Sequence, residues 1–296
     1  MVTTKLQFRK IELSDKPWID ELLKKSDFYG SEYCFGNNFI WANAYHSKIG
    51  RYKDFYLQFN EDAKHFSFPA GEGDLKEVIE LMMDYAEENG FPFVMHVSHE
   101  RNRKKLEELF PGRFDFAERR DYFDYIYSSE SLMTLKGKKL HSKRNFINRF
   151  IEKEWSAEPV TEENIHLCKE FNAFWCAQND CGEDESKREE MCAVRKALDH
   201  FFELGFKGCI LKQEGRVVAY SFGEPVNSNT FIVHVEKADS QVPGAYPMIN
   251  REFVRMFASD YEFVNREEDL GVEGLRRAKL SYNPVKFTVR YRVTPR

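Results

Sequence analysis

The sequence predicts an α+β protein of two domains, in which mixed, mostly antiparallel sheets are flanked by helices. The chain has 296 residues, which suits one large domain or two domains of about 150 residues each. Aromatic residues make up 15% of the chain and charged residues 31%, a composition typical of a folded protein. Apolar residues recur with helical spacing in some segments and with strand spacing in others, and the two kinds of segment alternate.

The first half of the chain is expected to mix strands and helices. Apolar side chains between Leu75 and Ala86 recur at i, i+3, i+4 and i+7, which predicts an amphipathic helix. Asp74 can cap the start of this helix, and Gly90 can end it. The elements expected in order are a strand at 6–11, a helix from Ser14, a strand at 54–59, the helix at 75–86, a strand at 91–98, a helix at 101–110 and a strand at 116–127.

The second half is more regular. Three strand patterns joined by turn signals predict an antiparallel meander, and two helices are expected to precede it. The elements expected in order are helices at 162–179 and 185–204, strands at 207–212, 216–223 and 230–236, a helix at 246–259, a strand at 261–265, a helix at 272–280 and a strand at 287–293. The helical pattern stops near Pro159, so the predicted domains are residues 1–155 and 156–296.

Positive charge is concentrated in two stretches without acidic residues, 131–151 and 275–296, although the formal net charge of the chain is −5. Such a distribution suits one localised anion better than general duplex binding, which favours a broad basic surface. The alternative is that both stretches are solvated faces that balance acidic neighbours. The basic residues are Lys136, Lys138, Lys139, Lys143, Arg144 and Arg149 in the first stretch, which is expected on a helix, and Arg276, Arg277, Lys279, Lys286, Arg290, Arg292 and Arg296 in the second.

Several classes of protein are disfavoured by composition and motifs. No apolar run approaches the length of a membrane span, and no basic-then-apolar leader follows Met1, so a cytoplasmic protein is expected. The six cysteines include no Cys-x-x-Cys pair, which predicts reduced thiols and no metal site. The sequence contains no P-loop, HExxH motif or Gly-x-Ser-x-Gly elbow.

A loop with Gln241, Gly244, Ala245 and Tyr246 lies between the last strand of the meander and the next helix. Backbone N–H groups ahead of a helix can hold a pyrophosphate, although such a loop is also an ordinary turn. The order of elements over residues 160–296 resembles the acyl-CoA-binding half of the GNAT acyltransferase fold. Gln241 and Gly244 match the Gln/Arg-x-x-Gly-x-Gly/Ala signature of that family, and Tyr246 departs from its last position.

Polar residues are dense between Asn265 and Pro284, where a strand is expected to end. Carboxylates at such an edge can act as general bases, and a nearby tyrosine can protonate a leaving group. Alternatively, Asp269 caps the next helix and the neighbouring acids form ion pairs with Arg276 or Arg277. The candidate residues are Asn265, Arg266, Glu267, Glu268, Lys279 and Tyr282. His234 is expected to face a cleft, or else to be a structural histidine.

Residues 138–150, 234–246 and 265–284 together resemble a bacterial family related to the C-terminal domain of phosphatidylglycerol lysyltransferases. Relatives are built as two tandem GNAT-like domains, as are the Fem-type aminoacyltransferases, whose Gly-Leu-x-x-Phe-Lys motif is similar to Gly274, Leu275 and Lys279 here. Ala278 replaces the phenylalanine of that motif. The resemblance implies that Lys279 stabilises negative charge on a carbonyl or phosphate during transfer.

These features together predict an acyl- or aminoacyltransferase that uses acyl-CoA or aminoacyl-tRNA as donor and an amine or hydroxyl as acceptor. We expect the loop 241–246 to hold donor phosphate, and Arg266 and Lys279 to supply positive charge. We also expect Glu267 or Glu268 to accept a proton, Tyr282 to return one, and His234 and Asn265 to contact substrate. The alternative is a catalytically silent tandem GNAT-like protein that binds RNA or a protein partner.

Overall fold

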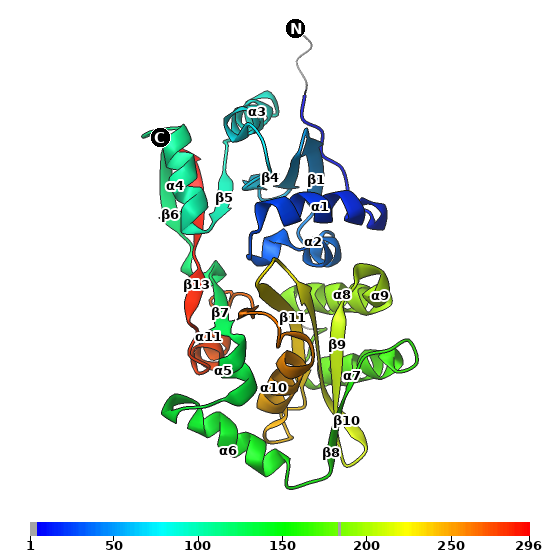
Figure 1. The fold of residues 1–296 in the computed structure, drawn as a ribbon. Coiled ribbons are helices and arrows are strands. Elements are labelled where there is room, and N and C mark those ends of the chain that lie inside the picture. The colour runs from blue at the N-terminus through cyan, green and yellow to red at the C-terminus, as the bar shows by residue number, and fades with distance from the viewer. Residues whose placement is uncertain (1–4, 183–184) are drawn as a thin grey trace. The chain divides into compact units, whose positions relative to one another are not determined.

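The computed structural model describes residues 5–182 and 185–296, and its chain forms two compact units (Figure 1). The first unit comprises residues 1–124, 268–271 and 288–296, of which the first four lie outside the described part. The second unit comprises residues 125–267 and 272–287. Each unit contains its own sheet and its own helices, so each is described separately.

The first unit contains a mostly antiparallel sheet in the order β1-β2-β3-β5-β14-β6, with β4 paired to β2. Among the described residues of this unit, β3 and β5 form the one parallel pair, and the segment that connects them contains the helix α3. The strands are β1 (Ser47–Tyr52), β2 (Phe55–Asn60), β3 (His65–Ser67), β4 (Ala70–Gly71), β5 (Met95–Ser98), β6 (Phe114–Glu118) and β14 (Arg290–Pro295). The helices are α1 (Lys16–Ser26), α2 (Phe35–Trp41), α3 (Leu75–Glu88) and α4 (Glu100–Leu109).

The second unit contains a sheet in the order β13-β7-β12-β11-β10-β9-β8. Its strands are β7 (Asp124–Ser128), β8 (Trp155–Pro159), β9 (Lys207–Gln213), β10 (Arg216–Pro225), β11 (Thr230–Ala238), β12 (Phe263–Asn265) and β13 (Lys286–Thr288). Its helices are α5 (Ser129–Thr134), α6 (His141–Phe150), α7 (Ile165–Gln178), α8 (Glu185–Asp199), α9 (Phe201–Leu204), α10 (Ala245–Phe257) and α11 (Glu273–Leu280).

Two apolar layers enclose the sheet of the second unit. On one face, Ile147 of α6 and Met248 of α10 belong to the same buried cluster as Ala219 of β10. On the other face, Phe171 of α7 packs edge-on against Tyr220, the next residue of β10. Successive strand residues point to opposite faces, so α6 and α10 cover one side and α7 the other.

Several predicted elements are confirmed because their signals are local. The amphipathic helix at 75–86 is α3, and the side chain of Asp74 caps it by accepting a hydrogen bond from the N–H of Glu77 at 3.0 Å. The predicted meander is formed by β9, β10 and β11, which pair antiparallel in sequence order. The prediction of an α+β chain with two mostly antiparallel sheets flanked by helices is therefore confirmed.

Other expectations are corrected by pairing between distant residues. The strand expected at 6–11 is reduced to one bridge between Arg9 and Ile49. The strand expected at 116–127 is divided into β6 and β7, which belong to different sheets, and the last strand is divided into β13 and β14. The helix expected at 185–204 is divided into α8 and α9. The expected domain boundary at residue 155 falls inside the second unit, where β8 pairs with β9.

Candidate active site

The two parallel strands of the second unit diverge at the centre of the sheet. β11 and β12 are paired from Thr230 and Phe263 to Ile232 and Asn265. β12 ends there, whereas β11 continues to Ala238. Crevices beyond the carboxyl ends of parallel strands are common ligand sites in sheets of this kind. The side chains around this divergence are therefore the first candidates for a site.

A β-bulge in β11 lies next to the divergence. Phe222 pairs with Val235 and Gly223 with Val233, so His234 is an additional residue on its strand. A side chain at Gly223 would overlap the carbonyl group of Ile232, so only glycine fits opposite the bulge. Bulges redirect side chains and are enriched beside active sites.

His234 lies between two carboxylates of the same unit. Its Nδ1 is 2.8 Å from Oε1 of Glu267, and its Nε2 is 3.0 Å from Oε1 of Glu224. The side chain is 2% exposed, and this burial by itself lowers the pKa of the imidazole. The hydrogen bonds to the two carboxylates outweigh burial and raise the pKa of His234 to about 9. His234 is therefore a buried imidazolium at neutral pH, and both ring nitrogens donate.

The backbone at Glu267 adopts a left-handed conformation that is rare for this residue, with φ of 56°. The N–H of Glu267 donates to Oδ1 of the buried Asn265 at 2.7 Å, and its carbonyl accepts from the N–H of Tyr125 at 3.1 Å. Unfavourable backbone conformations persist where the surrounding contacts determine them, often at functional sites. Asn265 thus holds the turn that directs Glu267 toward His234.

Arg266 forms a second buried charged cluster with β11 and α10. Its Nη2 donates to Oε1 of Glu236 at 2.7 Å, and Nδ2 of Asn250 donates to Oε2 of the same carboxylate at 2.8 Å. The Arg266 side chain is only 11% exposed. Within the described residues, Nη1 of Arg266 and Oδ1 of Asn250 are buried without a hydrogen-bond partner. A buried donor left unpaired is costly, and a ligand oxygen would satisfy it.

Tyr282 lies beside this cluster, between two cations. Its ring centre is 4.6 Å from the Arg266 guanidinium carbon and 4.1 Å from Nζ of Lys143 on α6. Burial raises the pKa of the Tyr282 hydroxyl well above its usual value, against the opposing effect of Arg266. Burial and the positive charge of Arg266 lower the pKa of Lys143. Tyr282 therefore stays protonated near neutral pH, and its hydroxyl can donate a hydrogen bond.

Lys279 acts on the backbone that carries Arg266. Its Nζ donates to the carbonyl oxygen of Arg266 at 2.6 Å, and its own carbonyl accepts from the Tyr127 hydroxyl at 2.7 Å. The ammonium group thus lies at the end of β12, where it fixes the chain immediately before Glu267. Lys279 is therefore a residue that positions Arg266.

The loop before α10 uses most of its amides internally. The N–H groups of Gln241 and Val242 bond to Asp239, and that of Ala245 bonds to Val242. Positions 243 and 247 are prolines, which have no N–H group. The donors required for the expected pyrophosphate cradle are therefore largely engaged.

The start of α10 is also closely packed. Gly244 has φ of 88°, and a side chain there would overlap the carbonyl group of Phe146 on α6. Ala245 is buried, and the hydroxyl of the half-exposed Tyr246 accepts a bond from Nε1 of Trp175 at 3.4 Å. The basic helix α6 therefore lies directly against the predicted donor loop.

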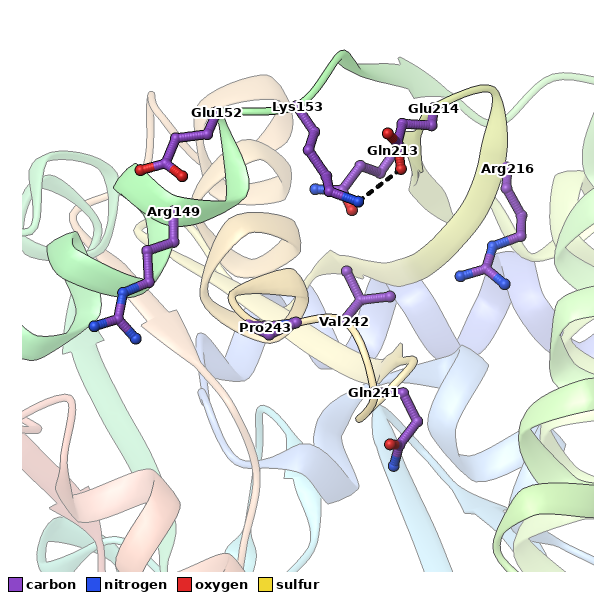
Figure 2. A pocket seen from close by; sticks show the side chains of 9 residues that line it. All are labelled: Arg149, Glu152, Lys153, Gln213, Glu214, Arg216, Gln241, Val242 and Pro243. Atoms are coloured by element: carbon purple, nitrogen blue, oxygen red, sulfur yellow. Dashed lines mark hydrogen bonds and ion pairs between the residues drawn. The ribbon is translucent and has the colours of Figure 1, made fainter.

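A pocket of about 630 Å³ opens on the outer side of this loop (Figure 2). Lys153 forms an ion pair with Glu214 at 2.8 Å, and Arg216 lies 3.7 Å from Asp239. In the described part of the chain, Arg149 forms no ion pair. The lining residues are Arg149, Glu152, Lys153, Gln213, Glu214, Arg216, Gln241, Val242 and Pro243, so Gln241 is the predicted loop residue that reaches this pocket.

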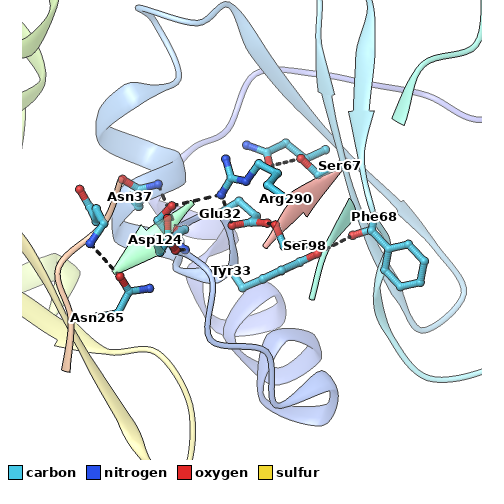
Figure 3. Close-up of polar contacts among 12 residues, drawn as sticks. Glu32, Tyr33, Asn37, Ser67, Phe68, Ser98, Asp124, Asn265 and Arg290 are labelled. Carbon is cyan, nitrogen blue, oxygen red and sulfur yellow. Dashed lines mark hydrogen bonds and ion pairs between the residues drawn. The ribbon is translucent and has the colours of Figure 1, made fainter. Parts of the chain in front are cut away.

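The predicted residues therefore fall into separate groups. His234 contacts Glu267, and Arg266 lies beside Tyr282 and is fixed by Lys279. Glu268 belongs to the first unit, where it adds to the negative charge around Arg290. Nη2 of that arginine donates to Glu32 at 2.7 Å (Figure 3).

Sequence reasoning missed Glu224, Glu236, Asn250 and Lys143 as members of these groups. One signal was available, because His234, Glu236 and Lys237 are ionisable residues within a strand whose other residues after Thr230 are apolar. Asn250 gave a weaker signal as an amide among the buried residues of α10. Nothing local linked either segment to Arg266.

The chain thus combines an α+β fold of two compact units with a buried charged site where two parallel strands diverge. The chain belongs to the protein family described as phosphatidylglycerol lysyltransferase, C-terminal, which it matches over residues 23–294. In the described residues, no helix combines the length and apolar character that crossing a bilayer requires.

Similar proteins are found among solved structures and among known sequences. A conserved protein of unknown function from Bacteroides thetaiotaomicron is 39% identical, with a TM-score of 0.93 over 98% of this chain and 100% of that one. The structure of L-PGS from Bacillus licheniformis is 15% identical, with a TM-score of 0.64 over 95% of this chain and 91% of that one, and so shares the fold. An uncharacterized protein of Mycoplasmoides gallisepticum is 28% identical over 57% of this chain, and the match spans 55% of that relative's length.

Proposed function

We propose that the chain is an acyl- or aminoacyltransferase that moves an acyl group from aminoacyl-tRNA or acyl-CoA to an amine or hydroxyl acceptor. The observation that carries this proposal is the buried Nη1 of Arg266, which has no partner in the described chain. It lies where β11 and β12 diverge, and a carbonyl oxygen that gains negative charge would satisfy it. Membership of the lysyltransferase-related family supports the same class of reaction.

The proposed reaction is a single acyl transfer. The lone pair of the acceptor attacks the donor carbonyl carbon, and the ester C–O bond or thioester C–S bond breaks. Arg266 donates to the carbonyl oxygen, and Tyr282 gives a proton to the leaving oxygen or sulfur. The acceptor loses its proton to solvent, and Tyr282 is reprotonated through solvent. Of the two acids expected as bases, Glu267 lies in the same unit as Arg266, but its carboxylate is bound by His234.

The surroundings of the donor loop favour aminoacyl-tRNA over acyl-CoA. The loop amides that would hold a pyrophosphate are already engaged. The helix α6 packs against Gly244 and belongs to a stretch of six basic residues without an acid. Such a surface suits the phosphates of an RNA chain.

We place the reaction in the cytoplasm, because all six cysteines are free thiols.

Transfer to hydroxylamine tests the proposal without knowledge of the natural acceptor. The protein is incubated with a mixture of aminoacyl-tRNAs or with acetyl-CoA, and hydroxamate is measured above the rate without enzyme. We expect Arg266→Lys to lower the rate by about a hundredfold, because the charge remains but the fork of donors is lost. Arg277→Ala is the matched control, since Arg277 is an exposed residue of α11 that pairs with Glu273.

Thermal unfolding of each variant shows whether it folds. Hydroxamate from aminoacyl-tRNA that depends on Arg266 supports the proposal. If the folded protein forms no hydroxamate above background from either donor, the transferase proposal is rejected. Stabilisation by tRNA without transfer would then support the silent binding protein.

A further inference from the structure

One face of the sheet in the first unit carries a row of polar side chains. Arg292 of β14 is directly opposite His96 of β5, and Ser67 of β3 is opposite His96 on its other side. The neighbouring Tyr291 points to the other face, where its hydroxyl donates to Glu100 on α4 at 2.8 Å. Because successive strand residues alternate, Arg292, His96 and Ser67 share the face opposite α4.

Two imidazoles are stacked on this face. The rings of His65 and His96 are 4.0 Å apart between centres, at an angle of 27°. Burial, followed by the charges of nearby arginines, lowers the pKa of His65 to about 4. Burial, His65 and the same arginines lower the pKa of His96 to about 2. In the described ranges neither ring has a hydrogen-bond partner, so each offers a neutral ring with a free N–H donor.

The arginines around the stacked rings are only partly neutralised. Arg290 is bound by Glu32 at 2.7 Å, and its Nε is buried without a partner within the described chain. Arg292 is paired with His96 across the sheet, and the N–H of Arg119 donates to the carbonyl oxygen of Arg290 at 2.9 Å. Over residues 5–182 and 185–296, neither of these two forms an ion pair with a carboxylate. Two cations beside neutral imidazoles therefore leave an excess of positive charge and of N–H donors.

We propose that this face binds a phosphate group through Arg119, Arg292 and the stacked pair His65 and His96. Guanidinium groups bind phosphate with two parallel hydrogen bonds, and the neutral imidazoles add donors at no cost in repulsion. The group is free phosphate or the phosphate of a lipid headgroup. This site goes beyond the proposed transferase function, because it uses residues of the first unit and no transfer step.

Histidine NMR tests the site on the whole chain with inorganic phosphate as the probe. The Cε1–H signals are assigned with His65→Asn and His96→Asn. We expect saturable shifts of both signals on addition of phosphate, and a rise in both titration midpoints, because the anion stabilises each imidazolium. We expect Arg292→Ala to weaken phosphate binding at least tenfold. Arg103→Ala is the matched control, since Glu100 binds Arg103 on the α4 side of the sheet at 2.7 Å.

The site is rejected if phosphate produces no saturable shift, or if Arg292→Ala binds it as tightly as the unchanged protein. Competition then identifies the source of the phosphate group. Vesicles of phosphatidylglycerol that displace phosphate where phosphatidylcholine vesicles do not indicate the phosphate of a lipid headgroup. A short single-stranded RNA that displaces phosphate would overturn this assignment in favour of an RNA phosphodiester. Phosphate binding that neither displaces indicates free phosphate. Hydroxamate formation should be unchanged in Arg292→Ala, so the failure of either proposal leaves the other testable.

Discussion

The charge on His234 predicts how the stability of the protein depends on pH. The pKa of this histidine is about 9 in the folded chain, against 6.5 for an ordinary histidine. A raised folded-state pKa contributes stability that is complete below pH 6.5 and is lost as the pH rises through 9. At 1.36 kcal/mol for each pH unit, this difference corresponds to roughly 3 kcal/mol. The side chain is 2% exposed, so solvent screening removes little of it.

The measurement is the free energy of unfolding in urea between pH 6 and pH 10.5, for the unchanged protein and for His234→Gln. The difference between the two proteins isolates the histidine from other groups that titrate at high pH. We expect this difference to fall by roughly 3 kcal/mol across the range. His166→Gln, at an exposed position of α7, is the control and should show no such trend. A pH-independent difference, or a His234 pKa below 7 by NMR, would refute the buried imidazolium.

Two further perturbations test packing and charge elsewhere. Gly244→Ala should destabilise the protein by roughly 2 to 4 kcal/mol in urea unfolding, because φ is 88° and the methyl group would overlap Phe146. Gly137 has a similar φ of 91° but open space around it, so Gly137→Ala should cost about 1 kcal/mol. Equal costs for the two substitutions would contradict the overlap with Phe146 at position 244. Asp15 is buried, which raises its pKa, but bonds from Arg9 and an indole N–H lower it to about 2. The ionised carboxylate of Asp15 therefore contributes to the free energy of unfolding above pH 3.8, and this contribution should be lost as the pH falls through 2. Asp15→Asn should remove this pH dependence and lower the free energy of unfolding by about 1 to 2 kcal/mol.

The regular parts of the fold could be predicted because their signals are local. Apolar spacing and the cap at Asp74 lie within one segment, and the turns of the meander lie between consecutive strands. Pairing between distant segments could not be predicted in this way. Residues 116–127 and 287–293 each have a strand pattern, but the pattern does not reveal that part of each belongs to a different sheet.

The sequence located only the part of the candidate site whose residues lie in one segment of the chain. The density of polar residues after residue 264 pointed to Arg266, Glu267 and Tyr282, which lie close together along the chain. The carboxylate that holds Arg266 comes from β11, and the amide on its other oxygen comes from α10. Lys279 was expected to act on substrate because of a motif, but its contact with the Arg266 carbonyl depends on the end of β12.

The buried charges at the diverging strands are poorly explained by stability. Replacing a buried ion pair by apolar side chains of similar volume is often neutral or stabilising, whereas removing one partner costs about 3 to 5 kcal/mol. Glu236→Leu should therefore destabilise the chain strongly, because the charge of Arg266 would remain buried. The double variant Glu236→Leu, Arg266→Met should recover most of the unfolding free energy and still fail to form hydroxamate. A double variant that is stable and active would show that the pair serves neither folding nor transfer, whereas a stable and inactive one separates the two roles and assigns the pair to transfer.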